Sequence, residues 1–316
     1  MKPEPMNKEN ETAAAIDTRE LSRGVLEFAR RASTEISTHD EELLPVLASK
    51  LPAGMAMYVA HTPKATLDDV VRVALKVQAL GFRASPHIVA RRLVSENALR
   101  AALGELREGG VEQVLLVAGD LDPPAGSFTS TLEVIDTGLL EKAQFARVGV
   151  AGHPEGHRAV GPTTLLAALR HKQEFARRSG IKVHIATQFG FNPDAVCAWE
   201  QHLAKEGISL PIHVGIAGPT PLPKLIKFAM HCGVGASMQS LVKNMSAMAN
   251  LARLATTPDE MLLGLIRGRA ASAASQLVQP HFYAFGGTVA TATWLRTVMD
   301  GNFTIEPDGR KFTLKS

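Results

Sequence analysis

Eight short apolar runs, each followed by a longer segment of helical periodicity, constrain the fold of this chain more than any other feature. Runs of β-branched and apolar residues that alternate with helical segments are typical of repeated βα units with a parallel sheet. The expected strands cover residues 32–38, 54–61, 83–90, 113–120, 147–155, 183–190, 212–218 and 282–287. Eight is the number of strands that a closed barrel requires. We therefore expect a (β/α)8 TIM barrel, with an open doubly wound sheet as the alternative.

The segments between these runs carry helix signals. Helices are expected over residues 66–80, 95–108, 165–178 and 222–231 and, before the last strand, over residues 238–252 and 258–276. Thr66 and Ser95 suit the first position of a helix because their hydroxyl groups can accept a backbone N–H. The long gap before the last strand predicts an extra helix rather than a second domain. We expect residues 1–20 to form a flexible tail and residues 21–316 to form one barrel domain.

Composition excludes several classes of protein. Of the 316 residues, 45% are hydrophobic and 21% are charged, which is typical of a globular protein and not of a disordered one. The net charge is +3, and no dense basic stretch contains aromatic residues, so we expect no nucleic-acid partner. The chain has two cysteines, no run of about 18 apolar residues and no signal-peptide pattern, which predicts a cytoplasmic protein without a membrane span.

Polar residues lie in or at the ends of several expected strands. Catalytic groups of βα barrels gather where the strands end, which makes these residues candidates for a site. They are Glu35, His61, His87, Asp120, His153, Glu155, His157 and Gln188. Structural roles are the alternative: Glu35 can pair with an arginine inside the barrel, Asp120 can start the turn that follows it, and His87 can be a core histidine.

The run from Gly152 to His157 contains two histidines four residues apart with a glutamate between them, as zinc proteases do. That spacing brings the ligands together only on a helix, whereas Pro154 and Gly156 predict a strand end and a loop. We therefore expect no metal site. The sequence also contains no P-loop and no G-x-G-x-x-G motif after a strand, which argues against a Rossmann cofactor site.

Taken in order, six segments between about residues 33 and 301 resemble motifs of the methylenetetrahydrofolate reductase family. They are Ser33-Thr34-Glu35, Ser85-Pro86-His87-Ile88, Ala118-Gly119-Asp120-Leu121, His153-Pro154-Glu155-Gly156-His157, Thr187-Gln188-Phe189 and His281-Phe282-Tyr283. The family has a flavin-binding βα barrel. The resemblance therefore implies an FAD-dependent oxidoreductase of one-carbon metabolism and methionine biosynthesis, which interconverts 5,10-methylenetetrahydrofolate and 5-methyltetrahydrofolate with NADH or NADPH as electron donor.

The resemblance also implies roles for individual residues. Glu35 matches the general acid that helps open the folate ring, Asp120 matches the carboxylate that meets flavin and folate, and Gln188 and Phe228 match folate contacts. The implied FAD contacts are His87, Asp120, His153, Glu155, His157 and Lys172. As an acid, Glu35 needs its proton near neutral pH, so we expect burial to raise its pKa. Asp120 is expected to stay ionised and to stabilise the cationic iminium.

Some positions depart from the family pattern. Thr164 and Ala167 or Ala168 stand where the family has a flavin-binding Asp and Asn, which predicts weaker retention of FAD. Lys224 and Gly287 replace the nicotinamide-binding glutamine and a late arginine, which leaves the electron partner open. Two alternatives therefore remain. The first is a family member that oxidises methyltetrahydrofolate in one-carbon catabolism or that uses an electron partner other than NAD(P). The second is a barrel that binds folate without catalysis. A homo-oligomer is expected.

Overall fold

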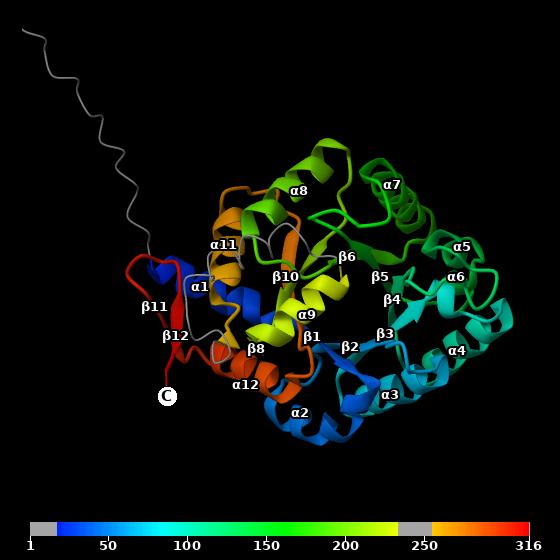
Figure 1. Ribbon diagram of the computed structural model, residues 1–316, viewed down its shortest axis with the longest axis horizontal. Helices are drawn as coiled ribbons and strands as arrows, with labels where there is room; N and C mark the ends of the chain where they lie inside the picture. Colours follow the sequence, from blue (N-terminus) through cyan, green and yellow to red (C-terminus); the bar gives the residue numbers. More distant parts are fainter. Residues whose placement is uncertain (1–17, 233–254, 316) are drawn as a thin grey trace, which may run out of the picture.

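The computed structural model describes residues 18–232 and 255–315, and its centre is a closed barrel of eight parallel strands (Figure 1). The barrel strands are β1 (Ser33–Ser37), β2 (Ala56–Ala60), β3 (Arg83–Val89), β4 (Gln113–Val117), β5 (Arg147–Gly152), β6 (Lys182–Thr187), β7 (Ile212–Ala217) and β10 (Leu277–Tyr283). Around the barrel their order is β1-β10-β7-β6-β5-β4-β3-β2. All eight predicted strands are present, so the (β/α)8 TIM barrel is confirmed and the open sheet is wrong.

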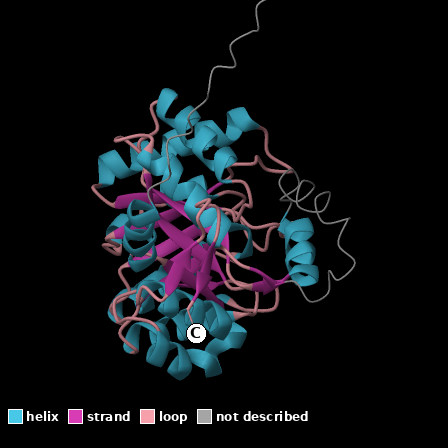
Figure 2. Cartoon of the chain, turned by 90° about the vertical axis from the view of Figure 1, so that its left-hand side faces the viewer, coloured by secondary structure: helices cyan, strands magenta, loops and turns pink. Residues whose placement is uncertain are grey.

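Helices surround the barrel (Figures 1 and 2). In chain order they are α1 (Thr18–Arg30), α2 (Leu44–Lys50), α3 (Leu67–Ala79), α4 (Glu96–Glu108), α5 (Thr131–Asp136), α6 (Leu139–Lys142), α7 (Pro162–Ser179), α8 (Pro193–Lys205), α9 (Leu222–Cys232), α11 (Asp259–Ala270) and α12 (Thr288–Met299). Both α9 and α11 lie between β7 and β10, so the extra helix before the last barrel strand is confirmed. The helix expected over residues 238–252 lies outside the described residues. Helix α1 begins at Thr18, within the stretch expected to be a tail.

Short elements complete the described structure. They are the 3-10 helices η1 (Thr38–Leu43) and η2 (Ala90–Arg92), the strand pair β8 (Thr220–Pro221) and β9 (Ala255–Thr256), and the pair β11 (Phe303–Ile305) and β12 (Phe312–Leu314). No described helix has both the length and the apolar character needed to cross a lipid bilayer.

Two helix starts follow directly from local sequence. The hydroxyl of Thr66 accepts the N–H of Asp69, and the Asp69 carboxylate accepts the N–H of Thr66, which forms a capping box before α3. The hydroxyl of Ser95 accepts the N–H of Ala98 before α4. Both residues therefore take the role that the sequence predicted, because a cap involves only neighbours in the chain.

Strand ends were harder to predict. Strand β10 begins five residues before the expected start and ends at Tyr283, because Phe285 and Gly286 have φ values of +46° and +72°, which a strand cannot contain. Strand β4 ends before Gly119, whose φ is +84°. Asp120 consequently lies in the loop after its strand rather than within it.

The barrel strands present different side chains to their two faces. Outward-facing residues such as Ile36, Val59 and Val114 are apolar and form one core with the helices. The interior contains Tyr58 and His184, which meet across the barrel from β2 and β6 and are at most 5% exposed. Most TIM barrels fill this space with branched apolar residues. The polar side chains here therefore need polar partners, and those partners define the candidate site.

Candidate active site

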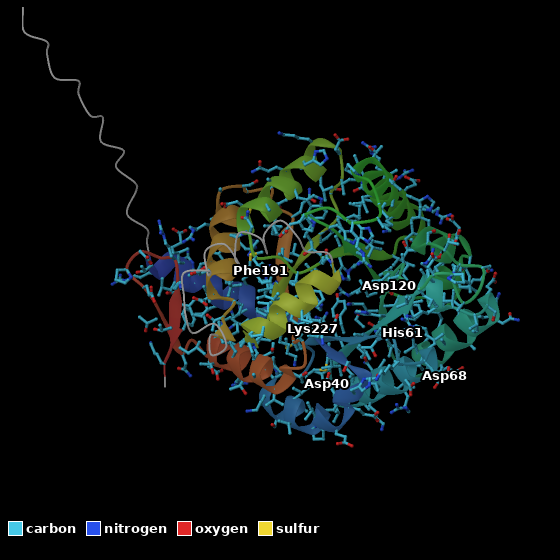
Figure 3. The ribbon with its side chains drawn as sticks, viewed as in Figure 1. Asp40, His61, Asp68, Asp120, Phe191 and Lys227 are labelled. Atoms are coloured by element: carbon cyan, nitrogen blue, oxygen red, sulfur yellow. The ribbon has the colours of Figure 1, made fainter. Side chains whose placement is uncertain are left out.

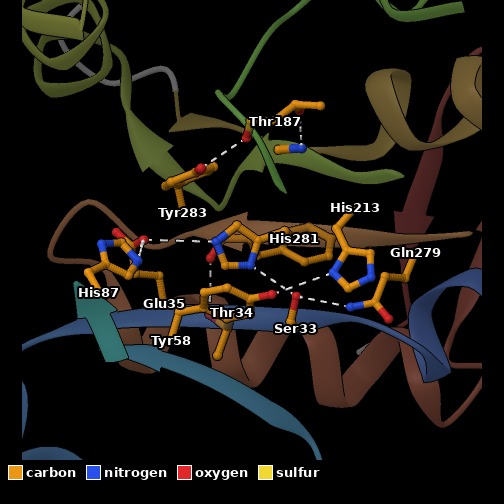
Figure 4. A network of polar contacts seen from close by, with 12 residues as sticks. Ser33, Thr34, Glu35, Tyr58, His87, Thr187, His213, Gln279, His281 and Tyr283 are labelled. Carbon is orange, nitrogen blue, oxygen red and sulfur yellow. Dashed lines mark hydrogen bonds and ion pairs between the residues drawn. The ribbon is translucent and has the colours of Figure 1, made fainter. Parts of the chain in front are cut away.

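Glu35 lies on β1 between two imidazoles (Figure 4). Its Oε2 is 3.3 Å from Nε2 of His87 on β3 and 3.9 Å from Nε2 of His281 on β10. The Glu35 side chain is 18% exposed, and His281 is fully buried. Glu35 thus has imidazole neighbours and no arginine partner among the described residues. None of these three facing atoms makes a well-directed hydrogen bond within the described structure.

The protonation state of Glu35 differs from the sequence-based expectation. Burial raises the pKa of Glu35, but the interactions with His281 and His87 lower it more, so that the pKa is about 2. The expected upward shift was therefore wrong in direction. The expectation assumed that Glu35 has apolar neighbours. Instead, β3 and β10 bring two imidazoles to the carboxylate, and a positive charge or an N–H donor favours its ionised form. Glu35 is a carboxylate at neutral pH.

A second polar group lies deeper in the barrel and involves residues that the sequence analysis did not select. The hydroxyl of Tyr58 is 2.8 Å from Nε2 of His184 and 3.5 Å from Nδ1 of His213, and it accepts a hydrogen bond from Gln113 at 3.2 Å. Burial raises the pKa of Tyr58, lowers that of His184 to about 3 and lowers that of His213. All three are neutral at pH 7. The signal in the sequence was their position on the inward face of their strands.

Asp120 lies exposed in the loop that follows β4 (Figure 3). Arg91 fixes this loop, because its side chain donates to the carbonyl of Leu121 at 2.7 Å and to the carboxylate of Asp122 at 2.7 Å. Asp120 itself makes no hydrogen bond or ion pair with the described residues, so its carboxylate is available to a ligand. His61, in contrast, uses Nε2 for a hydrogen bond to the carbonyl of Ala65 at 3.0 Å, whereas its buried Nδ1 makes no hydrogen bond with the described residues.

The loop after β5 and helix α7 form a second group of candidate residues. The rings of His153 and His157 meet edge to face with centroids 4.9 Å apart. His153 and Lys172 line a cavity of about 200 Å³, together with Trp199 and His202 from α8. Lys172 is 6% exposed and has no hydrogen bond or ion pair among the described residues, and burial lowers its pKa to about 8. Burial and the charges of His157 and Lys172 lower the pKa of His153 to about 4.

Gln188 and Glu155 lie near the end of β6. Gln188 directly follows the strand, and its backbone N–H donates to the carbonyl of Gly152 at 2.8 Å. A Cβ atom placed on Gly190 would lie 3.1 Å from Oε1 of Glu155, so the Glu155 carboxylate reaches from the β5 loop to the β6 loop. These two expected site residues therefore occupy neighbouring loops on one side of the barrel.

Phe228 on α9 belongs to a cluster of five aromatic side chains. We call this cluster the aromatic wall, and it consists of Phe189, Phe191, Phe228, Tyr283 and Phe285. Phe285 is its centre, because its ring lies 4.7 Å from that of Phe228 and 4.8 Å from that of Phe189. The sequence analysis selected only Phe228 from this cluster as a site residue. The others come from two strand ends that are almost 100 residues apart in the chain.

A model of the protein family described as methylenetetrahydrofolate reductase matches residues 42–259, which is more than half of the chain. The chain belongs to this family. The resemblance found in the sequence is therefore confirmed, and the family is one of oxidoreductases. The matched span contains the expected folate and FAD positions of the methylenetetrahydrofolate reductase family except Glu35, which lies before it on β1.

Solved structures with a similar fold come from several organisms. An uncharacterised protein from Clostridium thermocellum, which binds two copies of 5-methyl-5,6,7,8-tetrahydrofolic acid, matches with a TM-score of 0.52 and 11% identity over 88% of this chain and 100% of that chain. Dihydropteroate synthase from Thermus thermophilus matches with a TM-score of 0.43 and 13% identity over 84% of this chain and 90% of that chain. The likeness to the Clostridium thermocellum protein concerns the barrel fold alone.

The expected site residues of this methylenetetrahydrofolate reductase family member lie in five places in the structure. Glu35 and His87 are in contact at the interior ends of β1 and β3. His153, His157 and Lys172 surround the β5 loop and the cavity beside it. Gln188 lies at the end of β6, Phe228 lies in the aromatic wall, and Asp120 stands exposed after β4. His281 is the main addition, because the sequence analysis quoted it only as part of a motif.

Proposed function

We propose that this protein is an FAD-dependent oxidoreductase that interconverts 5,10-methylenetetrahydrofolate and 5-methyltetrahydrofolate, and that Glu35 exchanges the proton of the folate nitrogen. The observation that carries this proposal is the set of three buried polar atoms that face one another without well-directed hydrogen bonds: Oε2 of Glu35 and Nε2 of His87 and His281. Buried polar atoms without a well-directed hydrogen bond are rare in proteins and are often used by a ligand or a reaction. Membership in the family supports the oxidoreductase class.

The residues around the β5 loop fit an anionic cofactor. Lys172 is a buried ammonium group without a carboxylate partner in the described structure, and a buried charge of this kind needs an anion such as a pyrophosphate. The residues that would hold FAD are His87, Asp120, His153, Glu155, His157 and Lys172. When bound, FAD supplies hydride transfer to and from the one-carbon group of the folate.

Gln188 and Phe228 would hold the folate. Phe228 belongs to the aromatic wall, and offset or edge-to-face contacts with aromatic rings favour a flat heterocycle such as a pterin. The amide of Gln188 can donate and accept hydrogen bonds at the edge of such a ring. Binding of 5-methyl-5,6,7,8-tetrahydrofolic acid by the Clostridium thermocellum protein, which has a similar barrel, agrees with this choice of ligand.

Glu35 would act at the folate nitrogen that leaves the one-carbon group. In the reducing direction the carbon-nitrogen bond breaks, its electron pair stays on nitrogen, and Glu35 delivers a proton there, while Asp120 stabilises the cationic iminium. In the oxidising direction the ring closes and Glu35 takes this proton back. With a pKa of about 2, Glu35 is ionised at pH 7. The ionised form is the one that takes up the proton in the oxidising direction, so oxidation of methyltetrahydrofolate is the second candidate function.

An absorbance titration tests the proposal. Purified protein is scanned with and without added FAD and then mixed anaerobically with NADH, NADPH and 5,10-methylenetetrahydrofolate. Flavin bands that bleach with a nucleotide and return with the folate are the expected result. Bleaching by 5-methyltetrahydrofolate alone, with no response to either nucleotide, would favour the oxidising function with a different electron partner. No flavin binding under any condition would overturn both functions and favour a barrel that only binds folate.

A further inference from the structure

Gln279, which is half-buried, and the buried residues Ser33 and His281 form a chain of polar contacts that ends at Glu35 (Figure 4). The amide nitrogen of Gln279 donates to Oγ of Ser33 at 3.3 Å, and Oγ of Ser33 is 2.9 Å from Nδ1 of His281. Nε2 on the other side of the His281 ring is the atom that faces Oε2 of Glu35 at 3.9 Å. Ser33 and His281 are both 0% exposed, so water does not compete for these contacts.

These contacts determine which nitrogen of His281 carries the proton. The amide nitrogen of Gln279 can only donate, so Oγ of Ser33 accepts there. The hydroxyl hydrogen of Ser33 then has one acceptor among the described residues, which is Nδ1 of His281. Nδ1 is therefore unprotonated, and the neutral ring carries its proton on Nε2, on the side of Glu35.

We propose that Ser33 and His281 are positioning residues that hold Glu35 as a carboxylate at neutral pH, so that the site is prepared to accept the folate proton rather than to give one. This inference rests on the proposed function. An Nε2–H group 3.9 Å from the carboxylate oxygen places the positive end of its dipole beside the charge, which stabilises the ionised form and opposes the effect of burial. The inference assigns the protonation state of Glu35 to a buried contact and not to the ligand.

Few other titratable groups face Glu35. His87 on β3 is the second imidazole, 3.3 Å away, and its side chain is 13% exposed, so its contact with Glu35 does not depend on Ser33. Tyr58 on β2 packs against His281 with ring centroids 4.4 Å apart, and burial raises its pKa, so it is neutral. Tyr283 lies 4.8 Å from the His281 ring, and its hydroxyl donates to the carbonyl of Thr187. His281 is therefore the buried neighbour through which Ser33 can act on Glu35.

The first test is a titration of the protein without ligands by NMR. The ¹³C signal of the Glu35 carboxyl group, assigned with Glu35→Gln, should stay at its ionised position from pH 7 down to pH 4. In His281→Phe it should move at a pH higher by one unit or more, because burial remains and one donor is lost. His281→Gln keeps an N–H donor and should show a smaller shift. The ¹⁵N signals of His281 should show the proton on Nε2.

Ser33→Ala provides a second variant in case His281→Phe does not fold. It should weaken the preference for Nε2–H and move the Glu35 titration in the same direction as His281→Phe. The matched control is Ser85→Ala, which removes a hydroxyl group of equal burial from β3. The rate of the oxidative half-reaction falls below a certain pH as Glu35 becomes protonated. This pH should rise, together with the NMR titration, in His281→Phe and Ser33→Ala but not in Ser85→Ala.

Three outcomes would overturn the inference: a His281 proton on Nδ1, a Glu35 titration that is unchanged in His281→Phe and Ser33→Ala, or an equal change in Ser85→Ala. Failure of the proposed function has a different signature. It would appear as absence of flavin binding or turnover while the NMR titration still follows His281 and Ser33.

Discussion

Glu35→Gln should make the stability of this protein less sensitive to acid. The pKa of Glu35 is about 2 in the folded protein against an ordinary value of 4.5. A carboxyl group with a depressed folded-state pKa contributes stability that is fully present above its ordinary pKa and is lost as the pH falls toward the folded value. Ionised Glu35 contributes about 3 kcal/mol to the free energy of unfolding at pH 7. About 2 kcal/mol of this contribution is lost between pH 7 and pH 3. The glutamine variant has no proton to bind and loses none of this contribution.

The assay is urea unfolding followed by circular dichroism at pH 7, 5, 4 and 3. Other carboxyl groups titrate in the same range, so the informative quantity is the difference in unfolding free energy between wild type and Glu35→Gln at each pH. That difference should shift by about 2 kcal/mol in favour of the variant from pH 7 to pH 3. Glu108→Gln changes an exposed glutamate at the end of α4 and should follow the wild type. Parallel curves for wild type and Glu35→Gln would refute an ionised Glu35.

The remaining predictions concern the cofactor, the barrel interior and the aromatic wall. Lys172→Met should weaken FAD binding about tenfold in a fluorescence titration, and the affinity of the wild type should fall above pH 8, where Lys172 loses its charge, while that of the variant stays constant. Gly149→Ala places a Cβ 2.9 Å from Nε2 of His184 and should cost about 1–3 kcal/mol, whereas Gly104→Ala, with open space around it in α4, should gain about 0.5–1 kcal/mol in thermal melts. Phe285→Ala should raise the KM for folate about fivefold with little change in kcat, because it removes the centre of the wall; an unchanged KM would contradict a folate site there.

The barrel itself could be predicted from sequence because each of its signals is local. A strand appears as a short apolar run, and a helix start such as Thr66 appears as a cap that involves only the next three residues. Errors occurred where the backbone leaves a strand. Phe285 continues an apolar run, but its positive φ value depends on the packing of the loop that follows β10.

The candidate site was predictable in part. Glu35 and His87 could be selected because parallel strands that end together bring their end residues together. Their roles stay predictions. The contact between His184 and Tyr58 could not be predicted, because the two residues meet across the barrel from positions 126 residues apart in the chain. No local pattern encodes such a contact.

The sequence by itself determined the barrel, the family and the presence of a carboxylate on the first strand. Only the tertiary structure decided that this carboxylate is ionised. The reason is that burial and neighbouring donors act on the pKa of Glu35 in opposite directions, and the donors on His87 and His281 come from strands 52 and 246 residues further along the chain. A sequence shows that a carboxyl group will be buried, but the sign of its pKa shift depends on which side chains the closed barrel places beside it.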